Sequence, residues 1–318
     1  MDHITCYYAF FTTANSDDVH TDVWKQERCV ISMATLRINP KSRKKIARFG
    51  EWILMLLVVV WSIFPIYYIV ISAFKMPRNI FAYPPKIFPS EFTTVNFLEL
   101  FKNWSSFPTA LANSLIVTLA AVLLTVAVSL LAGFAYSRFS GKLVKNSAIF
   151  LLVIRMFPPI IISIPLYPVL NSMNKTVDPR AVLVLLYSAF EVAIMTWIFK
   201  TAFDRIPREL EEAALVDGCT QFQSFVRILI PLVAPTAVAV SILVGIYSWN
   251  EYIFAFLFTS SGSQTTPVLI AEMMGGLTGP SWGQVFAASV LQMIPMIFFL
   301  LIIQRFIVSG LMGGSLKG

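Results

Sequence analysis

Long apolar runs separated by short polar segments dominate this chain from residue 52 onward. A helix needs roughly 20 mostly apolar residues to cross the hydrocarbon core of a bilayer. Six runs exceed that length: residues 52–74, 110–135, 147–170, 181–203, 231–258 and 284–308. Prolines fall inside the third and fifth runs, so we expect breaks or kinks there. The pattern predicts an all-α polytopic membrane protein with six transmembrane helices.

A polar segment, residues 204–230, separates the fourth run from the fifth and is predicted to form two short helices. Three glutamates favour the positive N-terminal end of the first helix, and Gly218 suits the left-handed residue that ends it. Thr220 and Gln223 have the spacing of a capping box that opens the second helix. Four residues at i, i+3, i+4 and i+7 predict one apolar face on that helix. They are Phe222, Phe225, Val226 and Leu229.

Composition and charge agree with a membrane protein. Hydrophobic residues make up 57% of the chain and charged residues only 13%, about half the charged share of a soluble domain. Lysines and arginines are in excess on one side of the predicted topology, and such an excess marks the cytoplasm. This places both termini and the 204–230 segment inside the cell. The net charge of +7 is therefore interpreted as topology, and no nucleic-acid partner is expected.

The two ends of the chain are predicted to be cytoplasmic tails, residues 1–49 and 310–318, around a six-span domain of residues 50–309. Residues 1–32 form a disordered tail or lie upstream of a true start at Met33. The apolar stretch within them is too short for the core of a signal peptide.

Catalytic and metal-binding motifs are missing from the sequence. It contains no G-x-x-x-x-G-K-[ST] phosphate loop, no H-E-x-x-H and no G-x-S-x-G. Its three cysteines show neither disulfide nor metal spacing. We therefore expect a chain without an enzymatic site, a bound cofactor or a metal.

A few charges fall within the predicted spans, where each normally faces protein or water. Arg155 and Glu191 either pair and hold two helices together, or line a cavity for a polar solute. Glu251 lies in the polar and aromatic run 248–252. Aromatic faces beside amide and carboxylate groups suit a sugar, and a helix–helix polar contact is the alternative for this cluster.

The 204–230 segment resembles the loop signature of ABC importer permeases: E-A-A, three residues, Gly, nine residues, Ile, one residue, Pro. In that family the loop forms coupling helices that dock into a separate ATPase subunit. By this likeness the ATPase-coupling residues are Glu212, Ala213, Ala214, Asp217, Gly218, Ile228 and Pro231.

The likeness extends from about residue 50 to the end, and it is to the smaller permease of maltose-type carbohydrate importers. It is carried by residues 81–101, Met156-Phe157-Pro158, Trp249-Asn250-Glu251, Gln304-Arg305-Phe306 and the 309–318 tail. It implies a type I importer permease fold and a scoop that enters a binding protein, at Gly275, Gly276 and Leu277. The substrate pathway is predicted at Arg155, Phe157, Tyr167, Glu191, Trp249, Asn250 and Glu251.

The resemblance also implies the partners of the chain. They are a second homologous permease, an ATPase dimer that uses ATP and Mg²⁺, an extracytoplasmic solute-binding protein, and a sugar or polyol that the sequence does not name. The membrane is the bacterial or archaeal cytoplasmic membrane. Two other classes remain open at this point: an ion-coupled secondary transporter, which usually shows inverted repeats, and a membrane enzyme. We find neither a convincing repeat nor a reactive cluster.

Overall fold

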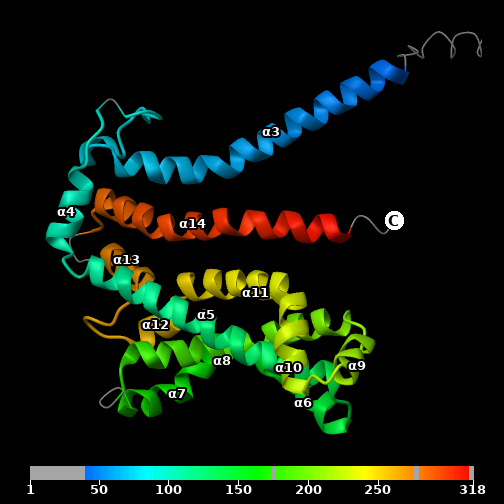
Figure 1. Ribbon diagram of the computed structural model, residues 1–318. Coiled ribbons are helices and arrows are strands. Elements are labelled where there is room, and N and C mark those ends of the chain that lie inside the picture. Colours follow the sequence, from blue (N-terminus) through cyan, green and yellow to red (C-terminus); the bar gives the residue numbers. More distant parts are fainter. Residues whose placement is uncertain (1–39, 90, 174–176, 276–278, 315–318) are drawn as a thin grey trace, which may run out of the picture. The chain divides into compact units, whose positions relative to one another are not determined.

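The computed structural model describes residues 40–89, 91–173, 177–275 and 279–314, and the regular elements in these ranges are all helical (Figure 1). Internal contacts divide the chain into two units, residues 1–65 and 66–318, so that α3 (Pro40–Ala73) begins in the first and ends in the second. The elements after it, all in the second unit, are η1 (Pro77–Asn79), α4 (Val95–Asn103), α5 (Phe107–Arg138), α6 (Lys142–Arg155), α7 (Pro159–Met173), α8 (Pro179–Asp204), α9 (Glu209–Val216), α10 (Gln221–Ser224), a π-helical turn (Phe225–Leu229), α11 (Ile230–Asn250), α12 (Ile253–Phe258), α13 (Thr266–Met274) and α14 (Trp282–Gly314).

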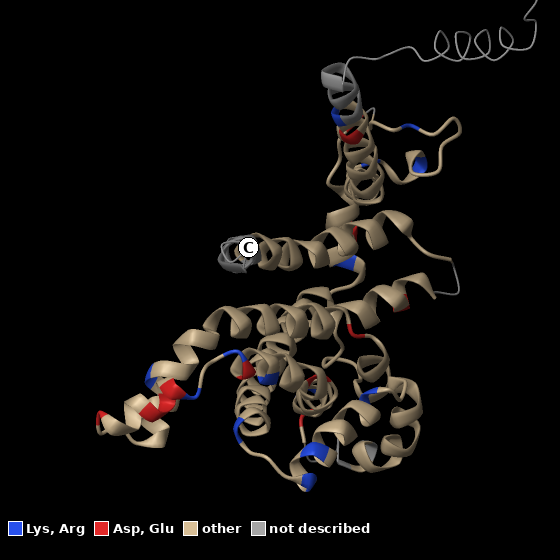
Figure 2. Ribbon diagram, turned by 90° about the vertical axis from the view of Figure 1, so that its right-hand side faces the viewer, with Lys and Arg blue, Asp and Glu red and all other residues tan. Residues whose placement is uncertain are grey.

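Five helical segments in the described residues are long and apolar enough to cross a membrane. They are Arg48–Ala73, Phe107–Arg138, Pro179–Asp204, Gln221–Asn250 and Trp282–Ile302. Figure 2 shows these long helices largely free of charge, with Lys, Arg, Asp and Glu mostly towards helix ends and in the connections. The predicted third span is not one straight helix: α6 and the first part of α7 meet at an angle of 92°. Pro158 and Pro159 fall at this bend, because proline cannot continue the hydrogen bonding of a helix, and the predicted break is confirmed.

The fifth predicted span differs from the structure at both ends. Its helical segment starts earlier, at Gln221, because α10, the π-helical turn and α11 follow one another without a break. It also ends earlier, at Asn250, where Glu251 adopts an extended conformation with ψ 130°. Figure 1 shows the segment changing direction between α10 and α11. Pro231, Pro235 and the π-helical turn are known causes of such a kink, which agrees with the prediction.

Small side chains let α5 and α8 pack closely. Ala121, Thr125, Ser129 and Gly133 recur every four residues along α5 and are all buried. A Cβ atom at Gly133 would lie 2.5 Å from Cβ of Phe199 on α8. Small residues at this spacing are typical of helix–helix contacts in membranes, since they allow the backbones to approach.

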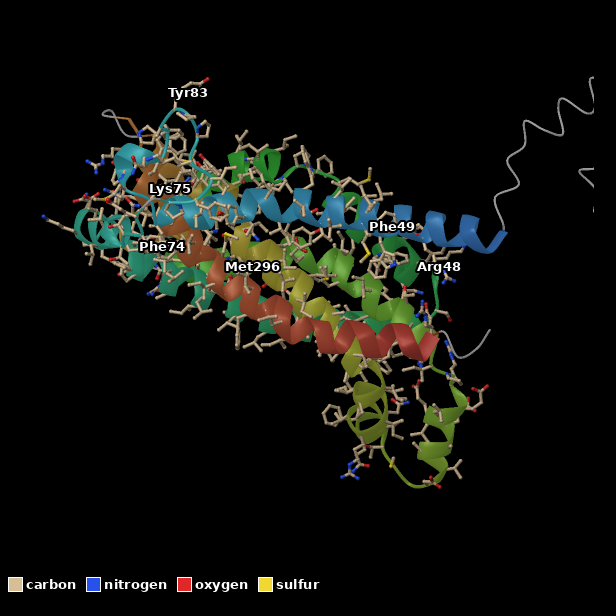
Figure 3. All side chains as sticks on the ribbon, turned by 90° about the horizontal axis from the view of Figure 1, so that it is seen from above. Arg48, Phe49, Phe74, Lys75, Tyr83 and Met296 are labelled. Atoms are coloured by element: carbon tan, nitrogen blue, oxygen red, sulfur yellow. The ribbon has the colours of Figure 1, made fainter. Side chains whose placement is uncertain are left out.

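The connection from α3 to α4 is held by two buried polar side chains. The Asn96 amide donates hydrogen bonds to the carbonyls of Ala73 (2.8 Å) and Lys75 (2.7 Å). The Lys75 ammonium donates to the Lys86 carbonyl (2.7 Å) and lies 5.0 Å from the centre of the Tyr68 ring. Figure 3 shows Tyr83 of the same connection pointing outward, and it is 95% exposed. Asn96 therefore fixes the end of one predicted span against α4.

The helix α14 passes the predicted boundary at residue 309 and continues to Gly314. The predicted C-terminal tail thus begins as part of a helix. Residues 315–318 lie outside the described residues, as does the predicted N-terminal segment 1–32.

Candidate coupling hairpin and transport cavity

The hairpin of α9 and α10 is built from local signals in the sequence. Gly218 has φ +89°, and its N–H donates to the Leu215 carbonyl (3.1 Å), while the Cys219 N–H donates to the Ala214 carbonyl (2.9 Å). These two bonds form a Schellman motif, which requires a left-handed residue and therefore favours glycine. The predicted end of the first hairpin helix is confirmed.

The second hairpin helix opens with the predicted capping box. The Gln223 N–H donates to Thr220 Oγ1 (3.2 Å), and the Thr220 N–H donates to Gln223 Oε1 (2.9 Å). Two backbone donors that a helix start leaves unpaired are thereby satisfied. The three glutamates lie in the first turn of α9, as predicted.

The predicted apolar face of the second helix is divided. Phe225 and Leu229 are buried, and the Phe225 ring lies 4.7 Å from the Phe134 ring of α5. Phe222 is 74% exposed, and Val226 is exposed as well. The i, i+4 rule assumes an α-helix throughout, whereas the π-helical turn from Phe225 adds a residue to the turn and rotates the following positions. The four positions of the predicted apolar face are therefore split between buried and exposed environments.

The outer flank of the hairpin combines exposed apolar and acidic side chains. Val216 is 87% exposed, and Glu212, Ala213 and Asp217 are exposed, whereas Ala214 is buried at 4%. Figure 3 shows the hairpin projecting from the long helices of the second unit. Of the remaining predicted coupling residues, Gly218 shapes the turn, Ile228 is half-buried in the π-helical turn and Pro231 is exposed in the first turn of α11.

Arg138, at the end of α5, ties the hairpin to two long helices. Its guanidinium forms an ion pair with Glu211 of α9 and donates to the carbonyls of Phe203 (3.2 Å) and Ile206 (3.3 Å) near the end of α8. The arginine side chain is only 10% exposed. A cavity of about 500 Å³ adjoins this contact, between the end of α5 and the hairpin. Nothing in the sequence pattern pointed to Arg138, because its partners are 65 to 73 residues away.

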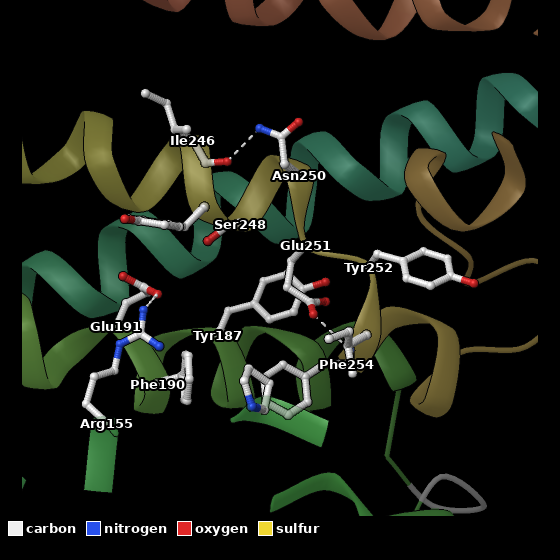
Figure 4. A pocket seen from close by; sticks show the side chains of 13 residues that line it. Arg155, Tyr187, Phe190, Glu191, Ile246, Ser248, Asn250, Glu251, Tyr252 and Phe254 are labelled. Carbon is white, nitrogen blue, oxygen red and sulfur yellow. Dashed lines mark hydrogen bonds and ion pairs between the residues drawn. The ribbon is translucent and has the colours of Figure 1, made fainter. Parts of the chain in front are cut away.

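A second cavity, of about 590 Å³, lies where two helix breaks meet (Figure 4). Pro159 at the α6–α7 bend and Glu251 and Tyr252 at the α11–α12 break line it, together with side chains of α8. Broken helices at a cavity are a recurrent way for membrane transporters to hold polar solutes. We refer to this space as the central cavity.

Arg155 and Glu191, two predicted pathway residues, form an ion pair at this cavity. Arg155 Nη2 lies 3.0 Å from Glu191 Oε1, with side chains 20% and 5% exposed. The guanidinium carbon also lies 3.7 Å from the centre of the Phe190 ring. The second carboxylate oxygen of Glu191 and Nε of Arg155 are buried. Both interpretations of these residues hold in the structure: they pair and so connect the end of α6 to α8, and both line the central cavity.

Glu251 has a backbone role in addition to lining the central cavity. Its carboxylate accepts hydrogen bonds from the N–H groups of Phe254 (2.9 Å) and Ala255 (3.1 Å), which begin α12. Asn250 is exposed at the same cavity, and its amide donates to the Ile246 carbonyl (2.8 Å). Glu251 thus stabilises the break between α11 and α12, which neither sequence interpretation of this cluster included.

Three predicted pathway residues do not line the central cavity. Trp249 is 1% exposed, and its indole N–H donates to the Gln292 carbonyl of α14 (3.1 Å). Tyr167 is half-exposed, with its ring 6.1 Å from that of Phe258, and Phe157 is exposed at the α6–α7 bend. Adjacent helix positions point about 100° apart, so a run such as 248–252 cannot present every side chain to one cavity.

Several lining residues were not predicted from the sequence, among them Tyr187 and Phe190 of α8. These two precede Glu191 by four positions and one position, and residues four apart lie on the same helix face. A search for aromatic residues at this spacing from an intramembrane charge would have found Tyr187.

The predicted scoop is described only in part. Gly275 follows α13, and its N–H donates to the Glu272 carbonyl (3.1 Å). Gly276 and Leu277 lie outside the described residues. Across the ranges that the structure describes, no cluster of His, Cys, Asp and Glu has the arrangement of a metal site.

The hairpin, the broken helices and the cavity define a polytopic membrane transport component. Residues 125–312 match the family described as "Binding-protein-dependent transport system inner membrane component", and the chain belongs to this family. It is a multi-pass inner-membrane permease component of an ABC importer. As a member of this family it binds no cofactor, and ATP hydrolysis belongs to a separate subunit.

Characterised relatives match most of the chain. It is 33% identical to the trehalose/maltose transport system permease protein MalG of Thermococcus litoralis, over 83% of this chain and 94% of the relative. It is also 33% identical to the trehalose transport system permease protein SugB of Mycobacterium tuberculosis, over 82% of this chain and 95% of that protein.

A solved structure shares the fold. A chain of a bacterial ABC transporter that imports the acidic polysaccharide alginate superposes with a TM-score of 0.72. The match covers 83% of this chain and 97% of the other, at 18% identity. The predicted all-α importer permease fold is thereby confirmed.

Proposed function

We propose that this chain forms half of the membrane path of an ATP-driven importer for a sugar or related polyol. The observation that carries this proposal is the central cavity, in which aromatic rings surround a fixed carboxylate at the junction of two helix breaks. Aromatic faces stack on the C–H faces of a sugar, while amide and carboxylate groups bond its hydroxyls. The sugar transport of the named relatives supports this substrate class.

The hairpin formed by α9 and α10, residues 209–224, is the coupling element in this proposal. Its exposed Val216 and Phe222 offer an apolar surface, and Glu212 and Asp217 offer charge to a partner. The assignment of Ala213, Ala214, Gly218, Ile228 and Pro231 to the coupling site rests on the likeness to importer permeases. Arg138 connects the hairpin to α5 and α8, so a displacement of α9 is passed to α8, which borders the central cavity.

The complete importer would contain a second homologous permease, an ATPase dimer and a solute-binding protein outside the membrane. The excess of Lys and Arg supports a cytoplasmic position for both predicted tails and for residues 204–230, in a bacterial or archaeal cytoplasmic membrane. The predicted scoop at Gly275, Gly276 and Leu277 would meet the binding protein on the other side.

Reconstitution tests both parts of the proposal. The chain is co-expressed with the second permease and the ATPase, and the purified complex is reconstituted into proteoliposomes with the solute-binding protein. ATP-driven uptake of radiolabelled trehalose and maltose is then measured together with ATP hydrolysis. We expect Gly218→Pro and Glu212→Lys to abolish coupled hydrolysis while the protein still inserts. Gly262→Pro is a matched control, because Gly262 also has a positive φ, +87°, but lies outside the hairpin.

The possible outcomes test the substrate class and the coupling element independently. Normal transport by both hairpin variants would rule out the hairpin as the coupling element. Uptake of amino acids or peptides, with no saccharide carried, would rule out the sugar class. Uptake by the chain alone, driven by an ion gradient, would favour a secondary transporter.

A further inference from the structure

The central cavity has an unbalanced set of charges. Three of its lining side chains are formally charged, Arg155, Glu191 and Glu251. Arg155 and Glu191 neutralise one another at 3.0 Å. Glu251 has no cationic partner among the residues that line the cavity, and its hydrogen bonds come from the backbone N–H groups of α12. The lining therefore has a formal charge of −1.

The single cation of the lining is already paired and stacked within the protein. Its guanidinium is stacked on Phe190 at 3.7 Å and paired with Glu191. The Nε atom of the same side chain is buried without a hydrogen-bond partner. A carboxylate or sulfonate in the cavity would therefore meet a lining of net negative charge, which opposes a further anion.

The aromatic lining acts in the same direction. Phe190 and Phe254 contribute rings from two helices, and Tyr187, Tyr247 and Tyr252 add three more. The face of an aromatic ring carries partial negative charge, which attracts cations and repels anions. The C–H faces of a neutral sugar pack against the same rings without a charge conflict.

We propose that this chain's side of the path selects uncharged or amino-substituted saccharides and rejects uronates, sulfonates and phosphorylated sugars, with Glu251 as the residue that determines this charge preference. The proposal deepens the proposed function and rests on it. It separates this chain from the alginate importer whose fold it shares, because that transporter carries an acidic polysaccharide.

The charge of the cavity is measured without knowing the sugar. Asn250 is exposed at the cavity, so Asn250→Cys provides a reporter thiol in a chain whose Cys6, Cys29 and Cys219 are changed to Ser. Membranes that contain the whole importer are treated with three methanethiosulfonates of similar size, carrying trimethylammonium, hydroxyl or sulfonate groups. Each reaction rate is divided by that of free 2-mercaptoethanol with the same reagent.

We expect the normalised ratio of the trimethylammonium rate to the sulfonate rate to be about five or higher at low salt, and to fall as salt screens the field. Glu251→Gln should bring the ratio close to one. The double variant Arg155→Gln/Glu191→Gln is the matched control, since it removes two charges without changing their sum, and the ratio should stay high.

A ratio of one or below in the Asn250→Cys chain would overturn the proposal, and so would a failure of all three reagents to react. The ratio measured on the Asn250→Cys chain tests the proposed charge preference even if the Glu251→Gln variant does not insert into the membrane. A high ratio that Glu251→Gln leaves unchanged would overturn the role of Glu251. Because the labelling involves no sugar, a cation-selective cavity in an importer that carries no saccharide would contradict the proposed function alone.

Discussion

Arg138 at the end of α5 pairs with Glu211 of the hairpin, and this contact joins the predicted coupling element to the membrane helices. The same guanidinium also bonds two carbonyls near the end of α8. We predict that Arg138→Gln lowers transport-coupled ATP hydrolysis about tenfold, because a buried charge-assisted contact contributes roughly 1.5–3 kcal/mol. Coupled hydrolysis in proteoliposomes measures the effect.

The control for Arg138 is a second ion pair at the end of α8. Lys200 and Asp204 form an i,i+4 pair that is 27% and 43% exposed, and such pairs contribute at most about 0.5 kcal/mol. Lys200→Gln should therefore leave coupling near the wild-type level. Equal losses in the two variants would show that Arg138 has no special role.

Close packing of α5 on α8 predicts a sharp difference between two glycines. Gly133→Ala places Cβ 2.5 Å from Cβ of Phe199 and 2.9 Å from the Lys200 nitrogen, so the helices must move apart at a cost of about 1–3 kcal/mol. Gly245→Ala meets only Val122 Cγ2 at 3.8 Å and should be neutral or stabilising. Thermal unfolding of the purified protein compares the two, and equal melting temperatures would contradict this account.

The buried pair of Arg155 and Glu191 predicts strong coupling between the two positions. Glu191→Gln leaves a guanidinium without its counter-ion, and the loss of one partner of a buried pair costs about 3 kcal/mol. The double variant Arg155→Met/Glu191→Met removes both charges and should be more stable than the Glu191→Gln chain. A double-mutant cycle of thermal unfolding tests this expectation, and additive effects would argue against the pair.

Lys75 predicts a pH dependence of stability at alkaline pH. Burial lowers the pKa of its ammonium group below the ordinary value of 10.5. Between the lowered folded-state pKa and 10.5, the unfolded chain binds more protons than the folded chain, so stability rises with pH in that interval. Below it both states are protonated, and the burial penalty is present in full.

Two methionine variants test the Lys75 prediction. The melting temperature of the wild type minus that of Lys75→Met should increase as the pH is raised from about 8 towards 10.5. Lys86→Met is the control, because the Lys86 side chain is exposed and only its carbonyl contacts Lys75. Parallel curves for the wild type and Lys75→Met would contradict the prediction.

Features fixed by neighbours in sequence could be predicted from the sequence. The Gly218 turn and the Thr220–Gln223 capping box are formed by residues within five positions of one another, and both are present. The break at Pro158 and Pro159 follows from the chemistry of proline. Two residues of the predicted apolar face, Phe222 and Val226, are exposed; the π-helical turn that shifts the positions after Phe225 is not visible in an i, i+4 pattern.

Contacts between distant segments could not be predicted in the same way. The Asn113 amide donates to the carbonyls of Gly262 and Gln264, about 150 positions away. The orientation of Trp249 towards Gln292 likewise depends on how α11 packs on α14. Hydropathy identifies both residues as part of a span and says nothing about which neighbour each will meet. Which residues line the central cavity is likewise determined by how the helices pack.

The π-helical turn of Phe225–Leu229 joins α10 and α11 rigidly, without a flexible linker. Gln221 to Asn250 is one hydrogen-bonded segment of 30 residues, so its two ends cannot rotate independently. Each residue of a helix advances it by about 100°. Deleting one residue from this turn would therefore rotate α10 by about that angle against α11 while leaving the rest of α11 unchanged, and the proposed ATPase-facing surface of α10 would point in a different direction.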